Sequence, residues 1–274
     1  MDGQILDQPL PFDGLDQIDP FLLIHHWEDE LPGGDHPRDL GVGPHPHRGF
    51  SPVTLVIKGE IEHRDSRGNR SIVSAGGVQW MNAGMGIIHS ERPSAKMARD
   101  GGELELIQIW INSPAVLKMR QPNYYPLSKD DIPLYRSSNG LVEIQVITGE
   151  IHGIRSGFMA TPTLLVLRGN LKAQGKVEIP IPEQFECLVY QLNGRIRVNE
   201  ELTTHIKNLT WFEKTGDSIL LEGEQEAEFI LFAGAPLNEP VERQGPFVMS
   251  DQTEIMRAMR DYQMGKMGFL VEEF

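Results

Sequence analysis

The feature that most constrains the fold is a weak internal repeat. With a shift of 135 positions, HPHRGFSPVTLVIKGEIEH at 45–63 aligns with PIPEQFECLVYQLNGRIRV at 180–198. Three residues coincide: Phe50 with Phe185, Gly59 with Gly194, and Ile61 with Ile196. A strand, a tight glycine turn and a returning strand therefore recur in register. The repeat predicts two copies of one β-fold.

Short apolar or alternating runs, separated by Gly, Pro and Asn, fill both halves of the chain. The 28 Gly and 19 Pro among 274 residues suit strands and turns better than helices. The expected strands are 53–57, 71–73, 78–81, 104–111, 141–147, 163–167, 188–192, 195–198, 218–221 and 227–232. One helix is expected after Asp251, with Ile255, Met256, Met259 and Tyr262 on one face. The sequence predicts an all-β chain with a short C-terminal helix.

The two copies should meet in the polar, Pro-rich stretch between 114 and 139. A chain of this length suits two domains of ordinary size. We expect an N-terminal domain at 1–125 that carries the site discussed below. The second domain is expected at 126–274 and includes the C-terminal helix.

The charge balance disfavours several classes of partner. Lys and Arg number 25 against 39 Asp and Glu, a net charge of −14, so direct nucleic-acid binding and anionic membranes are not expected. No apolar run approaches the roughly 20 residues that span a bilayer, and the first residues lack a signal peptide's basic and apolar regions. The single Cys187 is expected to be a buried, inert thiol in a reducing compartment. The expected location is the cytoplasm.

Two pairs of polar residues share one spacing in the first half. His45 and His47 are two residues apart, as are His89 and Glu91, and residues so spaced on a strand point to the same side. Two facing strand segments could thus bring three imidazoles and a carboxylate to one ion, at about 2.1 Å per nitrogen. Both histidines of the first pair align with prolines in the second copy. Taken singly, each residue could be structural, but together they favour a metal site in the first half only.

The remaining histidines of the first half, with His152, receive structural interpretations. His25 and His26 are adjacent and so face opposite sides of a strand, and His152 follows an expected strand end. His36 in the loop GGDHP and His63 in IEHRD could line the mouth of the metal site.

The motifs considered so far closely resemble the pirin family of the cupin superfamily. They are HPHRGF at 45–50 and VQWMNAGMGIIHSE at 78–91, with DPFLLIHHWE upstream and LIQIWIN downstream. The second half agrees more loosely, through the repeat and GPFVM at 245–249. The resemblance implies a bicupin, in which two antiparallel jelly-roll-type β-barrels pack face to face and only the first holds a metal.

The resemblance also implies the ligand set. Its four members, His45, His47, His89 and Glu91, are all present. In ordinary cupins a glutamate follows the H-x-H pair by four positions; here Ser51 stands there, and Glu91 looks like the replacement. The implied cofactor is one divalent transition metal, Fe(II) first, with Mn, Ni, Cu, Co or Zn as alternatives.

Two activities follow from the family. Several microbial members resemble quercetin 2,3-dioxygenases, which implies a flavonol-like aromatic substrate, O2, and Glu91 as the catalytic base for the 3-hydroxyl proton. An animal member acts as an iron-dependent transcriptional co-regulator, so the alternative is a non-catalytic iron or redox sensor that binds a protein partner. A cupin isomerase or storage protein is a third interpretation.

Some residues near these motifs keep two interpretations. Arg48 could stabilise an anionic substrate or pair with an acidic neighbour. Six apolar residues could line a substrate pocket or belong to the core: Phe50, Val53, Leu55, Trp80, Met81 and Ile109.

Overall fold

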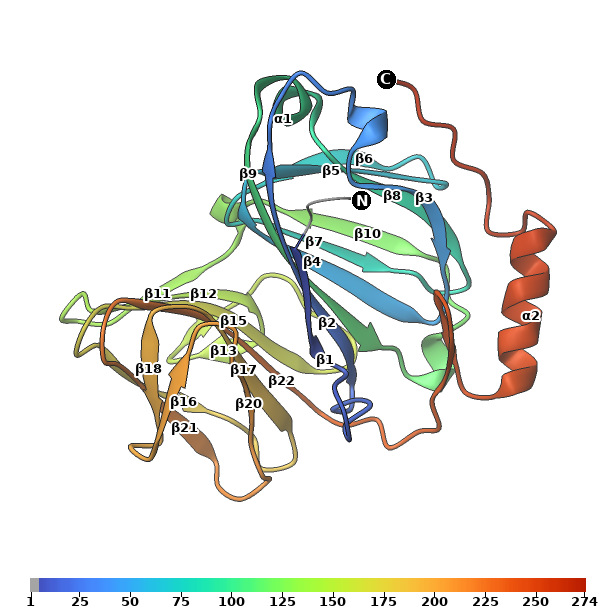
Figure 1. The fold of residues 1–274 in the computed structure, drawn as a ribbon. Coiled ribbons are helices and arrows are strands. Elements are labelled where there is room, and N and C mark those ends of the chain that lie inside the picture. The colour runs from blue at the N-terminus through green and yellow to red at the C-terminus, as the bar shows by residue number, and fades with distance from the viewer. Residues whose placement is uncertain (1–4) are drawn as a thin grey trace. The chain divides into compact units, whose positions relative to one another are not determined.

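The computed structural model describes residues 5–274, and antiparallel strands form most of it (Figure 1). By its internal contacts the chain divides into two units. The first comprises the described part of Met1–Gln17, with Phe21–Lys129 and Asn238–Phe274. The second comprises Ile18–Pro20 and Asp130–Leu237. Each expected strand segment overlaps a strand of the structure.

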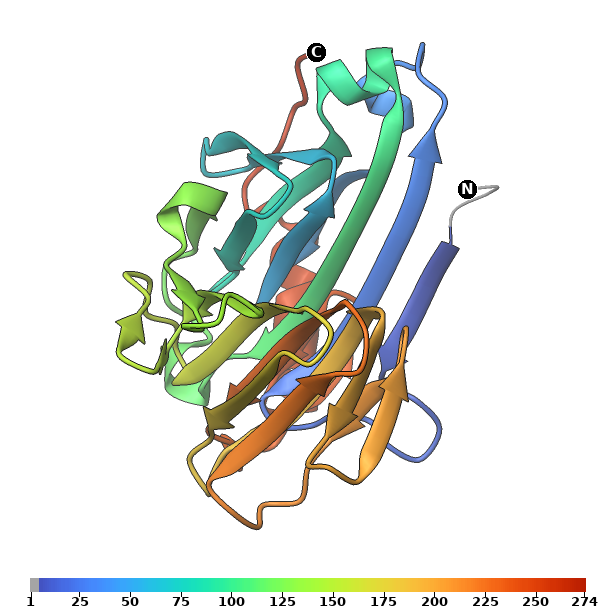
Figure 2. The same cartoon turned by 90° about the vertical axis from the view of Figure 1, so that its left-hand side faces the viewer.

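The first unit contains a six-stranded and a four-stranded sheet. The six-stranded sheet has the order β1 (Ile5–Leu10), β2 (Phe21–Leu31), β9 (Gly102–Asn112), β4 (Phe50–Lys58), β7 (Val78–Asn82) and β10 (Asn123–Leu127). The four-stranded sheet has the order β3 (Val42–His47), β8 (Ile87–Pro93), β5 (Glu60–Asp65) and β6 (Arg70–Ser74). The two long strands β2 and β9 lie side by side (Figure 2).

The second unit repeats this plan. Its six-stranded sheet has the order β11 (Leu134–Arg136), β12 (Val142–Thr148), β15 (Leu164–Leu171), β22 (Ala227–Gly234), β17 (Glu186–Asn193) and β20 (Leu209–Trp211). Its four-stranded sheet has the order β16 (Lys176–Pro180), β21 (Ser218–Gly223), β18 (Arg195–Val198) and β19 (Leu202–His205). A small hairpin joins β13 (Glu150–Ile151) to β14 (Ile154–Arg155).

The predicted repeat is confirmed by the strand order. The series β2-β9-β4-β7 corresponds to β15-β22-β17-β20, and β3-β8-β5-β6 corresponds to β16-β21-β18-β19. Gly59 and Gly194 turn the chain between the aligned strands at φ 76° and 71°. A Cβ on Gly194 would meet the carbonyl oxygen of Glu226 at 1.9 Å, so the turn requires glycine there.

The hydrogen-bonded strands do not form the closed barrels that the sequence led us to expect. Within the described chain, the strand ladders of each unit make separate sheets of six and four strands. Side chains on the inner faces hold such sheets together by packing, and a continuous strand ladder is not needed. Each unit is therefore built on two separate sheets rather than on one closed barrel.

The C-terminal helix α2 (Gln252–Gln263) begins where the sequence predicts. The side chain of Asp251 accepts a hydrogen bond from the Glu254 amide at 2.8 Å, which caps the helix. The buried face differs from the expected one, since Met256, Met259 and Tyr262 are exposed. The residues that α2 buries are Ile255 and Ala258.

Those two residues explain why α2 belongs to the first unit by its contacts, whereas the sequence analysis placed it in the second domain. They pack into one cluster with Ile88 of β8 and two residues of β24 (Phe247–Met249). β24 pairs with β23 (Glu242–Gln244). The described chain holds one other α-helix, α1 (Ala95–Asp100), and three 3-10 turns: η1 (Pro37–Asp39), η2 (Ala115–Leu117) and η3 (Lys129–Asp131). Neither helix has the length and apolar character that crossing a membrane requires.

Candidate metal centre

Three imidazoles meet on the inner face of the four-stranded sheet. His45 and His47 lie two residues apart on β3, and His89 on β8 is the direct cross-strand partner of His45. Their ligand nitrogens lie within 4.8 Å of one another. An ion about 2.1 Å from each nitrogen needs them within about 4.2 Å, which small ring rotations supply. The two motif segments are therefore hydrogen-bonded neighbours in one sheet, whereas two facing segments were expected from the sequence.

The hydrogen bonds of the three rings leave one nitrogen of each for a ligand. Nδ1 of His45 donates to the carbonyl oxygen of Gly43 at 2.8 Å, and Nδ1 of His47 donates to that of Pro246 at 3.4 Å. A neutral ring that donates from Nδ1 carries a lone pair on Nε2. The buried Nε2 of His89 has no hydrogen-bond partner among residues 5–274. A buried polar nitrogen in that state fits a metal ligand.

The surroundings of His47 and His89 favour the neutral form of these two rings. Burial, followed by repulsion from His45, lowers the pKa of His47 well below its ordinary value. Burial and the three neighbouring histidines lower the pKa of His89 in the same way. Because only the neutral imidazole binds a metal, these two rings can coordinate without losing protons first.

Glu91 lies on the same strand face but turns its carboxylate toward the six-stranded sheet. Oε1 accepts a hydrogen bond from Thr54 Oγ1 at 3.0 Å and another from the Gln79 amide, while Oε2 accepts from Gln108 Nε2 at 2.8 Å. In the described structure its oxygens are not members of the group of close ligand atoms. The structure thus brings together three of the four expected ligands and holds the fourth beside them.

The three residues that hold Glu91 were missed by the sequence analysis. Thr54 is the cross-strand partner of both Gln79 and Gln108, so three adjacent strands each contribute one polar residue at one level. In each of three strands a polar residue stands between two apolar ones, and this was the available signal. It becomes interpretable only once the register is known.

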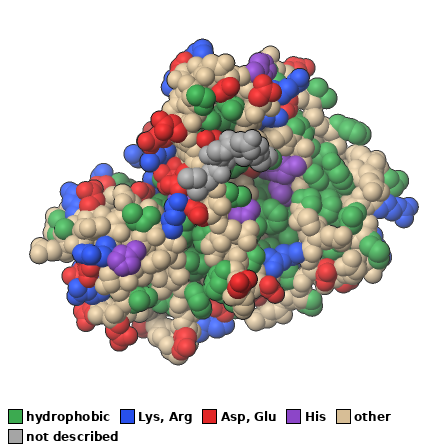
Figure 3. Space-filling model, in the orientation of Figure 1, with side chains coloured by type: hydrophobic (Ala, Val, Ile, Leu, Met, Phe, Trp, Pro, Cys, Tyr) green, Lys and Arg blue, Asp and Glu red, His purple; other side chains and the backbone are tan. Residues whose placement is uncertain are grey.

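An apolar cavity of about 470 Å³ opens onto the centre. His45, His47 and Glu91 line it together with Trp27 and Trp110. Apolar walls with a few convergent polar groups are typical of small-molecule sites. Figure 3 shows histidine side chains among hydrophobic ones on the face drawn there.

The six apolar residues proposed either for the pocket or for the core all belong to the core. None of them lines the cavity, and each is at most 2% exposed. Val53 and Leu55 alternate along β4 with Thr54, which faces the cavity, so they point to the opposite face of the sheet. The cavity wall comes instead from Leu104, Leu106 and Trp110, which are partly or fully buried on β9.

The structure also shows where several of the remaining histidines and Arg48 lie. His63 is fully buried beside His89 and does not line the mouth, and His36 is exposed at the start of η1. His25, interpreted as structural, lines the cavity. Arg48 pairs with an acidic neighbour, since Nη1 lies 3.0 Å from Oδ2 of Asp261 on α2.

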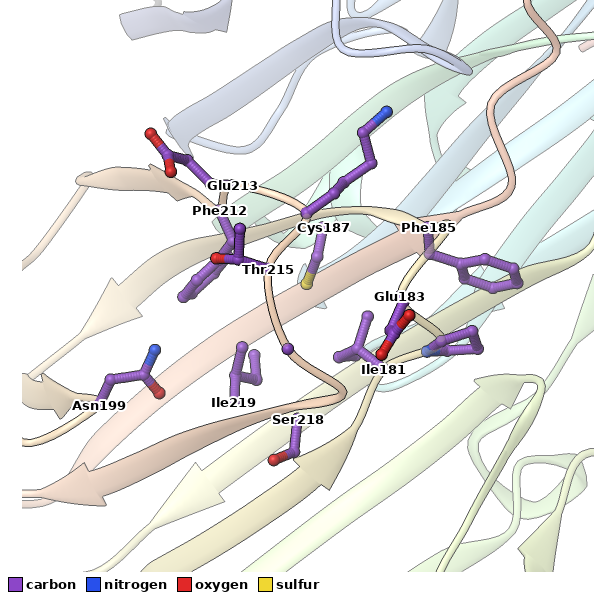
Figure 4. Close-up of a pocket in the computed structure, with 13 residues that line it drawn as sticks. Ile181, Glu183, Phe185, Cys187, Asn199, Phe212, Glu213, Thr215, Ser218 and Ile219 are labelled. Atoms are coloured by element: carbon purple, nitrogen blue, oxygen red, sulfur yellow. The ribbon is translucent and has the colours of Figure 1, made fainter.

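One cavity of the second unit, of about 150 Å³, is drawn in Figure 4. Its lining includes Pro182, which aligns with His47, together with Phe185 and Phe212. No histidine is among the lining residues, all of which the structure describes. The paired imidazoles of the first unit therefore have no counterpart in this cavity.

Cys187, in the same cavity, is expected to be unreactive in the folded protein. Burial raises the pKa of its thiol to about 12, so the thiolate is about one part in 10⁴ near pH 8. A chromogenic disulfide reagent should therefore release almost no colour from native protein. It should release one equivalent after denaturation. Rapid reaction of the native protein would contradict the buried position.

Comparison with known proteins finds relatives that match both halves of the chain. The family model described as Pirin matches residues 4–111, and that of the Pirin C-terminal cupin domain matches 166–268. Human Pirin is 36% identical, over 93% of this chain and 85% of its own. A Pseudomonas aeruginosa protein provisionally named a quercetin 2,3-dioxygenase is 35% identical, over 91% of this chain and 86% of its own.

A solved structure extends the likeness to three dimensions. The crystal structure of a quercetin 2,3-dioxygenase from Acinetobacter baumannii is 34% identical and superimposes with a TM-score of 0.91. The match covers 97% of this chain and 92% of that one. With its two cupin units and its matches along both halves, the chain belongs to the pirin family.

Proposed function

We propose that the first unit is a metal-dependent dioxygenase that cleaves quercetin or a related flavonol with O2. The observation that carries the proposal is the group of three imidazoles, His45, His47 and His89, of which the first two line an apolar cavity. The names of the similar Pseudomonas and Acinetobacter proteins support the same reaction. We also propose that the protein works in the cytoplasm.

The donor set fits a first-row divalent ion. Nitrogen donors without thiolates suit iron, manganese, nickel, copper or zinc, and we propose Fe(II) as the resident ion. When bound, the ion would supply Lewis acidity and a template that orients substrate oxygens and O2. His45, His47 and His89 would hold it, with Glu91 available as a fourth donor.

The cavity fits a flat aromatic substrate. Its volume of about 470 Å³ lies within the usual range for small-molecule sites, and Trp27, Leu104, Leu106 and Trp110 give it apolar walls. These walls would hold the rings of a flavonol and exclude water. The hydroxyl and carbonyl oxygens of the substrate would then face the polar end at Glu91.

Glu91 is the proposed base. Its carboxylate is oriented by Thr54, Gln79 and Gln108 and lines the cavity, so it can accept the 3-hydroxyl proton of the flavonol. General-base help of this kind is typically worth about 10² to 10⁴ in rate. A matching loss is expected when the carboxylate becomes an amide.

The test is oxygen uptake with quercetin by protein loaded anaerobically with iron. Wild type is expected to consume O2, and Glu91→Gln is expected to keep its iron while the rate falls by about 10² to 10⁴. Cys187→Ala, in the second unit, serves as the control and should retain wild-type uptake.

Two other outcomes are informative. Loss of iron from Glu91→Gln would identify Glu91 as a metal ligand first. Absence of uptake by wild type with stoichiometric iron would overturn the dioxygenase proposal and favour the non-catalytic sensor that binds a protein partner.

A further inference from the structure

We propose that Asp65 and His63 are positioning residues for the metal, because they form a buried hydrogen-bonded chain that orients His89. The inference rests on the proposed metal centre but not on the proposed dioxygenase reaction. It concerns the affinity and coordination geometry of the ion.

The contacts determine which group donates and which accepts at each step of this hydrogen-bonded chain. Nε2 of His63 lies 3.0 Å from Oδ2 of Asp65, and Nδ1 of His63 lies 3.4 Å from Nδ1 of His89. An ionised carboxylate only accepts, so Nε2 of His63 donates to Asp65. In the neutral ring of His63, Nδ1 then accepts from Nδ1 of His89. This arrangement leaves the lone pair of His89 on Nε2, the buried atom with no partner in the described chain.

The far end of the chain is fixed by the turn between β5 and β6. Oδ1 of Asp65 accepts hydrogen bonds from the backbone amides of Arg67 and Asn69, at 2.8 and 3.1 Å. Oδ2 accepts a third from Nδ2 of Asn69 at 2.8 Å. The carboxylate therefore has one orientation available, and the histidine that binds it inherits that constraint.

A stacked aromatic ring also fixes the plane of the His63 ring. The His63 ring stacks on Tyr124 of β10 with the ring centroids 3.8 Å apart and the planes 5° from parallel. Oη of Tyr124 lies 2.6 Å from Oγ of Ser71, which fixes the tyrosine in turn. His63 and Asp65 have fully buried side chains, so no solvent competes for these bonds.

The other two imidazoles lack such support. Their Nδ1 atoms bind backbone carbonyl oxygens, whereas His89 binds a ring that is itself bound to a carboxylate. The needs of the turn do not explain why Asp65 also binds His63. The hydrogen bonds that the Asp65 carboxylate accepts from backbone amides close the turn without the histidine. Outer partners of this kind fix the tautomer of a metal-bound histidine, and their loss typically weakens metal binding about 10- to 100-fold.

Two substitutions separate hydrogen bonding from packing. His63→Phe keeps a ring against Tyr124 but removes both nitrogens, and is expected to lower Co(II) affinity about 10- to 100-fold. Asp65→Asn keeps the size but removes the charge, so a smaller loss is expected. His205→Phe makes the same exchange at an exposed histidine of the second unit and should bind as wild type does.

The measurement is Co(II) affinity by competition with a chelating dye, together with the visible spectrum of the bound Co(II). A shifted spectrum is expected in His63→Phe because the ring of His89 is free to tilt. The double variant, His63→Phe with Asp65→Asn, provides the decisive comparison. Once His63 is replaced the chain is broken, so adding Asp65→Asn should cause no further loss of affinity.

Every outcome bears on the proposal. Wild-type affinity in both single variants would overturn it and leave the metal centre standing. Additive losses in the double variant would also overturn it, since they indicate two separate effects on the fold. Failure of wild type to bind Co(II) stoichiometrically would overturn the metal centre itself, and this inference with it.

Discussion

Replacing His89 by alanine is expected to lower the affinity for divalent metal by more than about 100-fold, since loss of an outer partner alone costs about 10- to 100-fold. The ring of His89 contacts both of the others: its centroid lies 4.3 Å from that of His45 and 5.0 Å from that of His47. Its loss removes one of three nitrogens and separates the remaining pair from the supporting chain. Oxygen uptake with quercetin should fall to background.

Metal content after dialysis, measured by elemental analysis, checks this prediction. His205→Ala provides the control, because that histidine is exposed on the second unit. Retention of tightly bound metal by His89→Ala would mean that the ion binds elsewhere. The other group of close ligand atoms in the described chain would then be the place to examine: Asp7, His26 and Glu28.

Replacing Lys118 by methionine is expected to lower the free energy of unfolding by about 3 kcal/mol near neutral pH. Three buried acceptors lose their donor, at about 1 to 3 kcal/mol each. Removal of a buried charge offsets part of this cost. Nζ lies 2.7 Å from the carbonyl oxygen of Gly49, 2.5 Å from Oδ1 of Asn112 and 3.2 Å from the carbonyl oxygen of Val248. Lys118 thereby ties the turn after β3 to β24.

The stability carried by Lys118 should also depend on pH. Burial lowers its pKa from 10.5 to about 8, despite attraction from Glu239 and Glu254. Between these two values the unfolded chain binds more protons than the folded protein, so wild-type stability should rise with pH across this window. The deficit of Lys118→Met should therefore be larger near pH 10 than near pH 7.5.

Urea unfolding at both pH values tests the two statements together. Lys96→Met, at an exposed position of α1, supplies the matched control and should unfold as wild type does. A Lys118→Met variant as stable as wild type would show that the three acceptors find other donors. A deficit that does not grow with pH would contradict the lowered pKa.

Local sequence patterns predicted the secondary-structure elements well. Apolar alternation located the strands because a strand has a period of two, and Asp251 marked the start of α2 because its side chain caps free amides. The H-x-H and H-x-E spacings placed His45 with His47, and His89 with Glu91, on common faces. These features depend only on residues close together in the chain.

Long-range pairing decided the rest. Which face of β4 lines the cavity follows from its register with β7 and β9, and a shift of one residue exchanges Thr54 for Val53. The buried stripe of α2 was likewise set by its packing against β24, which favours Ala258 over Met259. Periodicity alone does not distinguish between such neighbouring faces.

By itself the sequence determined that two β-units exist and that three histidines and one glutamate of the first unit share inner-face positions. Only the tertiary structure decided that the imidazoles converge, that Glu91 is held by Thr54 and its neighbours, and that His63 supports His89. The physical reason is that spacing along one strand sets the direction of a side chain, whereas its partners come from other strands. Their positions depend on register and packing across the whole unit.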